Sequence, residues 1–141
     1  MHFRKIVFVC CFLAPVAAWA SDALIYAAVY ECNADEINQA LVTDCSATYP
    51  SLSVDAAEAL RKWRNRNTAK AKLAKNACES ELSFKGGNVT PAEVEAFQSK
   101  ISNIKSDIRK DFLARQQSGG EAVCIDALHL LETGSGAMDL K

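Results

Sequence analysis

Four cysteines and one histidine carry the most reactive side chains beyond residue 20, namely Cys32, Cys45, Cys78, Cys124 and His129. They could form two disulfides, a zinc site, or a thiol nucleophile with a histidine base. No Cys-x-x-Cys pair is present, and a catalytic thiol would leave an odd number of cysteines to pair. We therefore expect two disulfides, no metal and no cofactor.

A second cluster lies between residues 63 and 70 and could bind a ligand: Trp63, Arg64, Arg66, Asn67 and Lys70. Asn67 follows Trp63 by one helical turn and falls on the same apolar face. Since a buried amide must find hydrogen-bond partners, we interpret Asn67 first as a structural lock. Its expected partners are the indole N–H or a free backbone group. An enzyme or accessory site between helices around Trp63, Arg66 and Asn67 is the alternative.

The same stretch is strongly basic. Seven basic residues and no acid occur between Arg61 and Lys75: Arg61, Lys62, Arg64, Arg66, Lys70, Lys72 and Lys75. They could attract an anionic component of the cell envelope, or they could be neutralised by acidic neighbours in the same fold. Because they spread over both flanks and the outer side of a helix, we favour neutralisation. Nucleic acid is not expected, since no aromatic residues alternate with the basic ones.

Residues 1–20 have the pattern of a secretory signal peptide. Arg4 and Lys5 precede an apolar run over 6–16, and Ala18-Trp19-Ala20 is a small-residue cleavage site. A membrane span needs about 20 apolar residues, and Pro15 interrupts this run. We expect cleavage after Ala20, export to the periplasm or beyond, and 121 of the 141 residues in the mature chain.

The element that must position the second cluster is one long helix from Ser53 to Leu82. Its inward stripe has three- and four-residue steps: Ala56, Leu60, Trp63, Asn67, Ala71, Ala74, Cys78 and Leu82. Ser53 is a plausible N-cap, and Gly86-Gly87 follows the last turn. This helix places Trp63 at the middle of the expected core.

Other helices are expected before and after it. Residues 23–30 are predicted helical, and Asn33 or Asp35 could cap a helix that ends before Tyr49-Pro50. Thr90-Pro91-Ala92-Glu93 predicts a capping box for a helix over 91–117, with Val89 and Val94 as a hydrophobic staple.

The apolar stripe of the 91–117 helix is Val94, Phe97, Ile101, Ile104, Ile108 and Phe112, which predicts lengthwise packing. A shorter helix from Glu121 puts Cys124, Leu128 and Leu131 on one side. Gly134-Ser135-Gly136 then releases a mobile tail over 134–141. The predicted fold is all-α, a small antiparallel bundle of three to four helices in one domain over 21–133.

Helix lengths rank the three possible disulfide pairings. Ser53 to Cys78 spans about 38 Å of helix, so Cys45, near Pro50, and Cys78 should lie at opposite ends of the bundle. The helix after Pro91 runs back about 40 Å and brings Cys124 to the end that holds Cys45. We therefore predict Cys32–Cys78 and Cys45–Cys124.

Several of these residues together resemble a family pattern. Cys45, Tyr49-Pro50, Trp63, Arg66-Asn67 and Cys78 resemble small secreted proteobacterial helical proteins in which a cysteine and an aromatic-proline pair precede a Trp-x-x-Arg-Asn helix. A looser similarity is to the small secreted lysozyme-inhibitor proteins, whose Trp is followed by an Arg-Asp step; Asn67 stands in place of that acid here. The resemblance implies export and a helical, cysteine-linked fold.

The sequence thus favours a non-enzymatic binding or inhibitory module of the bacterial cell envelope. An inhibitor of a cell-wall hydrolase or an immunity protein would be an example, and an envelope protein or an anionic envelope component would be the partner. A pocket lined by Trp63, Arg66 and Asn67 would favour the enzyme alternative. An exposed apolar or acidic surface elsewhere would favour the binding module.

Overall fold

The computed structural model describes residues 14–84, 90–135 and 138–140, and these residues are almost entirely helical. The elements are α1 (Ala14–Thr48), the 3-10 turn η1 (Pro50–Leu52), α2 (Ser53–Phe84), α3 (Pro91–Gly119) and α4 (Glu121–Thr133). The all-α prediction with two disulfides is confirmed. The leader up to residue 13, Gly86-Gly87 and Val89 lie outside the described residues.

Helix α1 contains the two helical segments that the sequence predicted, joined at a kink. Asn33 has φ −127° and ψ 20°, which are not helical values. Its side-chain amide donates to the carbonyl oxygen of Val29 at 2.8 Å. The helix ends at Thr48, and Pro50 starts η1, as expected for a proline that disfavours helix in the residue before it. The predicted cleavage site after Ala20 lies inside α1.

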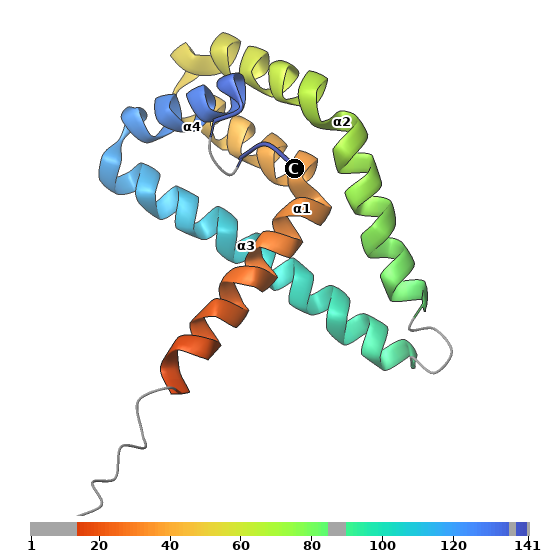
Figure 1. Ribbon diagram of the computed structural model, residues 1–141. Coiled ribbons are helices and arrows are strands. Elements are labelled where there is room, and N and C mark those ends of the chain that lie inside the picture. The colour runs from red at the N-terminus through yellow and green to blue at the C-terminus, as the bar shows by residue number, and fades with distance from the viewer. Residues whose placement is uncertain (1–13, 85–89, 136–137, 141) are drawn as a thin grey trace, which may run out of the picture.

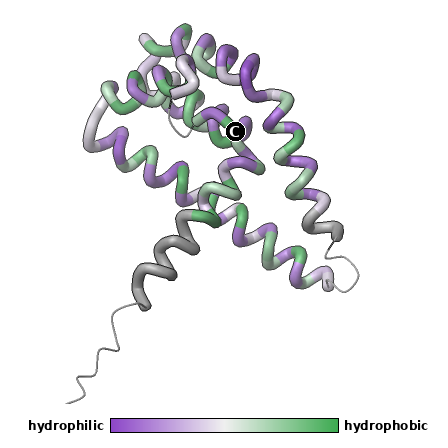
Figure 2. Tube along the Cα trace, viewed as in Figure 1, coloured by the Kyte–Doolittle hydropathy of each residue, from purple (hydrophilic) through white to green (hydrophobic). Residues whose placement is uncertain are grey.

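Helix α2 is continuous and has the predicted inward face. Ala56, Leu60, Trp63 and Asn67 are between 0% and 5% exposed, whereas Ala71, Ala74 and Cys78 are half-buried. The main core lies where the first half of α2 meets α1 and α4 (Figure 1). Apolar and polar residues alternate along α2 and α3 in Figure 2, as expected for helices with one covered side.

Helix α3 begins as predicted but does not pack along its whole length. The Thr90 hydroxyl accepts from the backbone N–H of Glu93, and the Thr90 N–H donates to the Glu93 carboxylate at 2.7 Å. Of its predicted stripe only Ile104 is buried, and Phe97 is 45% exposed. The prediction of lengthwise packing is wrong because α3 crosses α1 instead of running beside it (Figure 1).

Two ion pairs between charged side chains also hold α3 to α1. Arg109 donates to both carboxylate oxygens of Asp44, at 2.8 and 2.7 Å, and Lys105 contacts Glu36 at 2.7 Å. The C-terminal part of α3 reaches α4, where Gln116 is buried. Hence only the crossing point and the last turns of α3 join the core.

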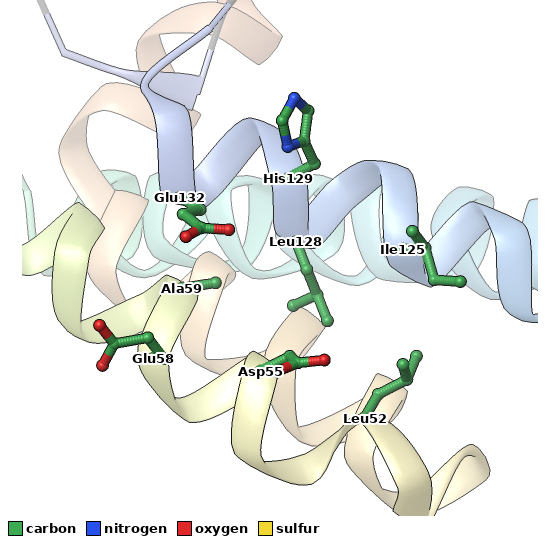
Figure 3. A pocket seen from close by; sticks show the side chains of 8 residues that line it. All are labelled: Leu52, Asp55, Glu58, Ala59, Ile125, Leu128, His129 and Glu132. Carbon is green, nitrogen blue, oxygen red and sulfur yellow. The ribbon is translucent and has the colours of Figure 1, made fainter.

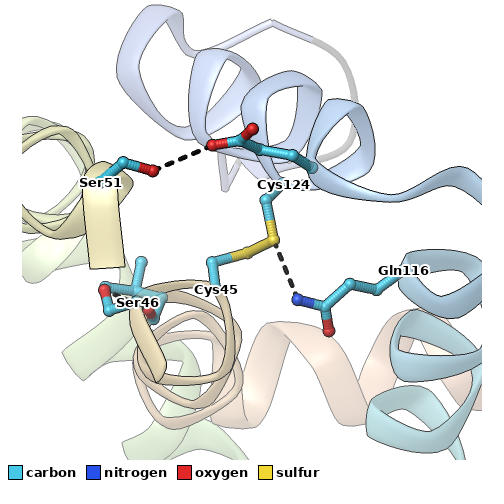
Figure 4. Close-up of a disulfide and its surroundings, with 7 residues drawn as sticks. Cys45, Ser46, Ser51, Gln116 and Cys124 are labelled. Carbon is cyan, nitrogen blue, oxygen red and sulfur yellow. Dashed lines mark hydrogen bonds between the residues drawn. A yellow bond between two sulfur atoms is a disulfide. The ribbon is translucent and has the colours of Figure 1, made fainter. Parts of the chain in front are cut away.

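Both predicted disulfides are present. The Cα atoms of Cys32 and Cys78 are 6.2 Å apart, and those of Cys45 and Cys124 are 5.7 Å apart. The second bond is fully buried, and the amide of Gln116 donates to the sulfur of Cys124 at 3.3 Å (Figure 4). The first bond joins α1 to the half of α2 that lies outside the main core. Cys45 and Cys78 therefore do not pair with each other, as the length of α2 predicted.

The end of the chain differs from the mobile tail that the sequence predicted. Gly134, with φ 72°, ends α4 in the left-handed conformation that glycine adopts without strain. The chain then returns to the core (Figure 1), and Leu140 is only 6% exposed. The glycines mark the end of a helix, but the residues after them find polar partners on α1 and α2.

Candidate functional site

Four of the five candidate binding residues contact Met138–Leu140, which we call the tail segment. The indole N–H of Trp63 donates to the carbonyl oxygen of Met138 at 2.6 Å. The hydroxyl of Tyr30 donates to the same oxygen at 3.0 Å. We call Tyr30, Trp63, Arg66, Asn67 and Lys70 the tail site. Burial is the main cause that raises the pKa of Tyr30 above its ordinary value, so its hydroxyl keeps its proton.

Asn67 uses both ends of its amide at this site. Its nitrogen donates to the carbonyl oxygen of Trp63 at 3.0 Å and to the Asp139 carboxylate at 2.8 Å. Its oxygen accepts from the backbone N–H of Leu140 at 3.0 Å. Lys70 donates to the carbonyl oxygen of Leu140 at 2.7 Å. Asn67 therefore occupies the position of a structural lock whose backbone partner is on the tail segment.

Arg66 joins the tail segment to the end of α4. Its guanidinium donates to both carboxylate oxygens of Asp139, at 3.1 and 3.2 Å. It also donates to the carbonyl oxygens of Leu131 and Glu132, at 2.5 and 2.7 Å. These carbonyls lie at the negative end of the helix dipole, where a cation is stabilising. The hydrogen bond from Arg66 is the main cause that lowers the pKa of Asp139 below its ordinary value.

Arg64 belongs to a different part of the surface. It donates to both carboxylate oxygens of Asp35, at 2.7 and 3.1 Å, and to the side chain of Gln39 at 3.0 Å. The sequence thus grouped one residue too many and missed Tyr30 and the tail segment. No periodic pattern joins residues 30, 67 and 139, so only the fold brings them together.

The basic run of α2 is largely neutralised within the fold. Arg61 donates to Glu58 at 2.8 and 2.6 Å, and Lys62 contacts Glu132 at 2.5 Å. With the partners of Arg64, Arg66 and Lys70, five of the seven basic side chains contact acidic groups or carbonyl oxygens. Lys72 and Lys75 have no such partner in the part of the chain that the structure describes. This arrangement supports the interpretation that acidic neighbours balance the helix.

An open cavity lies elsewhere, between α4 and the beginning of α2 (Figure 3). It has a volume of about 210 Å³. Its lining, which we call the groove, consists of Leu52, Asp55, Glu58, Ala59, Ile125, Leu128, His129 and Glu132. Neither Trp63, Arg66 nor Asn67 contributes to it.

The groove has an apolar floor and a polar rim. Leu52, Ala59 and Leu128 are buried, and Ile125 at the mouth is 50% exposed. In Figure 3 the ring of His129 points away from α2, while Leu128 points into the space between the two helices. Lys62 lowers the pKa of Glu132 by donating a hydrogen bond to it. The groove can therefore accommodate an apolar side chain of a partner on its floor, with polar side chains around it.

No protein-family model, curated protein or solved structure matches the chain. Among the described residues, no group of three or more histidine, cysteine or acidic side chains is placed to hold a metal ion. Over the same residues, no helix combines the length and the apolar composition that a membrane span requires.

Proposed function

We propose that this protein is an exported, non-enzymatic binding or inhibitory module of the bacterial cell envelope. One observation carries the proposal. Trp63, Arg66 and Asn67, around which an enzyme site was the alternative, contact the tail segment, whereas an open cavity between α4 and the beginning of α2 is lined by other residues. We expect the surface around this cavity to bind a partner by fitting its shape and charge, without catalysing a reaction. An inhibitor of a cell-wall hydrolase or an immunity protein would act in this way.

The groove is the surface through which the module binds a protein partner. Ile125 at its mouth is an exposed apolar side chain beside a buried apolar floor, which is the arrangement of the centre of a protein interface. Asp55, Glu58 and Glu132 also line it, but Glu58 and Glu132 already contact Arg61 and Lys62 of the same chain. The partner's contact residue is accordingly an apolar side chain.

An anionic envelope polymer has less support as the partner. It would bind the basic run of α2, but five of those seven side chains already contact acidic groups or carbonyl oxygens of the same chain. Lys72 and Lys75 have no such partner among the described residues, and two charges are too few for strong binding to a polyanion. A protein partner at the groove therefore has more support than an anionic polymer on the basic run of α2.

The test is affinity capture from a periplasmic extract with the oxidised protein and with an Ile125→Lys variant. Ile125 is half exposed, so the variant should fold while placing a cation in the mouth of the groove. We expect one envelope enzyme or toxin in stoichiometric amount with the unchanged protein and at least tenfold less with the variant. Leu73→Lys is the matched control, since Leu73 is 70% exposed on the distal half of α2.

Equal recovery of the partner with Ile125→Lys and Leu73→Lys would show that the partner does not bind at the groove. Recovery of no stoichiometric partner would contradict the binding module itself. Inhibition of the captured enzyme by the unchanged protein, measured as its rate of cell-wall hydrolysis, would separate an inhibitor from a passive binder.

A further inference from the structure

We propose that the tail site is a peptide-binding site, which the chain fills with its own tail segment. Its ligand is a short peptide with a carboxylate side chain between two apolar residues, as in Met138-Asp139-Leu140. A peptide of this chemistry from another chain competes with the tail segment for the site. The site is separate from the groove, because it uses no groove side chain.

Side chains of the tail site recognise the backbone of the tail segment. The carbonyl oxygen of Met138 accepts from Tyr30 and Trp63. The N–H and the carbonyl oxygen of Leu140 bond to Asn67 and Lys70. Side chains from two helices thus bond to three backbone groups of the tail segment. A segment that packed only by apolar contact would not need these four groups.

The central residue of the tail segment, Asp139, is recognised through its side chain. The planar guanidinium of Arg66 contacts both oxygens of Asp139, and the amide of Asn67 donates to one of them. This paired geometry matches a carboxylate and is lost with a neutral or basic side chain. On the apolar side, Leu140 is 6% exposed and belongs to the core cluster. The site therefore discriminates between sequences.

Contacts that do not involve the tail segment hold the side chains of the tail site in place. Asn38, which is fully buried, donates to the hydroxyl of Tyr30 at 3.0 Å. Asn67 is held by the carbonyl oxygen of Trp63, and Arg66 by those of Leu131 and Glu132. None of these bonds involves the tail segment, so we expect the side chains to keep them when it leaves. A site already in its binding geometry loses less entropy on binding.

The tail segment has the advantage of being attached to the same chain. A short link gives a tethered ligand an effective concentration on the order of millimolar, so a free peptide binds the unchanged protein weakly. A substitution in the tail segment that weakens its own binding, and leaves the side chains of the tail site unchanged, should increase the affinity for a free peptide. Asp139→Lys does this, because it sets a cation against Arg66.

The probe is a fluorescently labelled peptide with the sequence of residues 135–141, and its binding to the full oxidised chain is followed by polarisation. We expect the Asp139→Lys protein to bind it at least tenfold more tightly than the unchanged protein does. The same peptide with alanine in place of the aspartate should lose at least tenfold in affinity. Adding Arg66→Ala to the Asp139→Lys protein should abolish the preference for aspartate.

The Leu140→Ser protein is a second variant with a weakened tail segment and should also gain affinity for the free peptide. Circular dichroism and peptide mapping of the Cys45–Cys124 bond show whether each variant is folded. A folded Asp139→Lys protein that binds neither peptide, or binds both equally, would overturn the proposal. If that variant were unfolded, equal binding of the two peptides by the Leu140→Ser protein would overturn it.

Discussion

The indole N–H of Trp63 donates a hydrogen bond of 2.6 Å to the carbonyl oxygen of Met138, 75 residues further along the chain. Trp63 itself has no exposed surface. One side chain thus joins the middle of α2 to the end of the sequence and fills the centre of the core. It is also the single tryptophan in a chain that begins at Ser21, since the other is Trp19. Its fluorescence should therefore report on the tail segment.

Trp63→Ala should lower the free energy of unfolding by about 3–5 kcal/mol, as expected for a large buried aromatic side chain. The indole leaves a cavity where α1, α2 and α4 meet, and the tail segment loses a hydrogen-bond donor. Urea denaturation followed by circular dichroism measures the change.

Arg64→Ala is the control on the neighbouring position. The Arg64–Asp35 pair is substantially exposed, with side-chain exposures of 41% and 52%, so its loss should cost about 1 kcal/mol or less. Equal shifts in the two urea midpoints would show that the inward face of α2 has been misassigned.

Asn67→Ala should destabilise the protein by about 1–3 kcal/mol, because the backbone N–H of Leu140 and the carboxylate of Asp139 would each lose a partner. The matched control is Asn76→Ala, an exposed amide on the same helix, for which we expect a change within about 0.5 kcal/mol. Urea midpoints compare the two. A loss for Asn76→Ala as large as that for Asn67→Ala would refute the role of Asn67 as a lock.

Acid should release the tail segment. Arg66 holds the pKa of Asp139 below its ordinary value in the folded protein. A carboxyl whose pKa is lowered by folding contributes its full stabilisation above its unfolded pKa, and this is lost as the pH falls through the folded pKa. We expect the Trp63 emission to shift to longer wavelength as the pH falls below about 4, the ordinary pKa of an aspartate, where the stabilisation from the ionised Asp139 begins to be lost.

The Asp139→Asn protein separates this carboxyl from the other acidic groups that titrate in the same range. The variant has no carboxyl to protonate at this position, so the emission of Trp63 below pH 4 should change less than in the unchanged protein. Identical titration curves for the two proteins would mean that another group controls the environment of Trp63.

The two disulfides should differ in their contribution to stability. Cys45 and Cys124 are fully buried and 79 residues apart, whereas Cys32 and Cys78 are half-buried and 46 residues apart. Loss of a native disulfide costs about 2–5 kcal/mol, and the longer closed loop favours the upper part of that range. In urea, Cys45→Ala/Cys124→Ala should be less stable than Cys32→Ala/Cys78→Ala, and the reverse order would contradict this ranking.

Export should remove residues 1–20 and leave no free thiol. Intact mass of protein from the periplasm should correspond to a chain that begins at Ser21 and carries two disulfides. Alkylation without a reductant should leave that mass unchanged. An N-terminus that retains Met1, or any alkylated cysteine, would count against export with full oxidation.

Local patterns predicted much of the fold. The steps between Ala56 and Asn67 gave the inward face of α2, and the Thr90-Pro91-Ala92-Glu93 sequence marked the start of α3. Both rest on interactions within a few residues, or on one face turned toward apolar neighbours. The disulfide pairing followed because a continuous helix fixes the distance between its ends.

Contacts between residues far apart in the sequence could not be predicted from such local patterns. The apolar stripe of α3 predicted burial along its length, but the crossing angle with α1 leaves Phe97 exposed. Likewise, Gly134 predicted where α4 ends, but it gave no indication that Leu140 is buried in the core. The candidate residues Trp63 and Asn67 were recognised, but their partner was not, because it depends on tertiary contacts 73 to 75 residues away.

The order of the cysteines along the chain has a consequence for biogenesis. The bonds interlace, since Cys32 pairs with Cys78 and Cys45 with Cys124. A chain that crosses a membrane amino end first exposes Cys32 and Cys45 to oxidants before either correct partner arrives. Oxidation in order of emergence would join those two, and thiol–disulfide exchange would then have to undo the bond. Efficient production of this protein should therefore depend on a disulfide isomerase as well as on an oxidase.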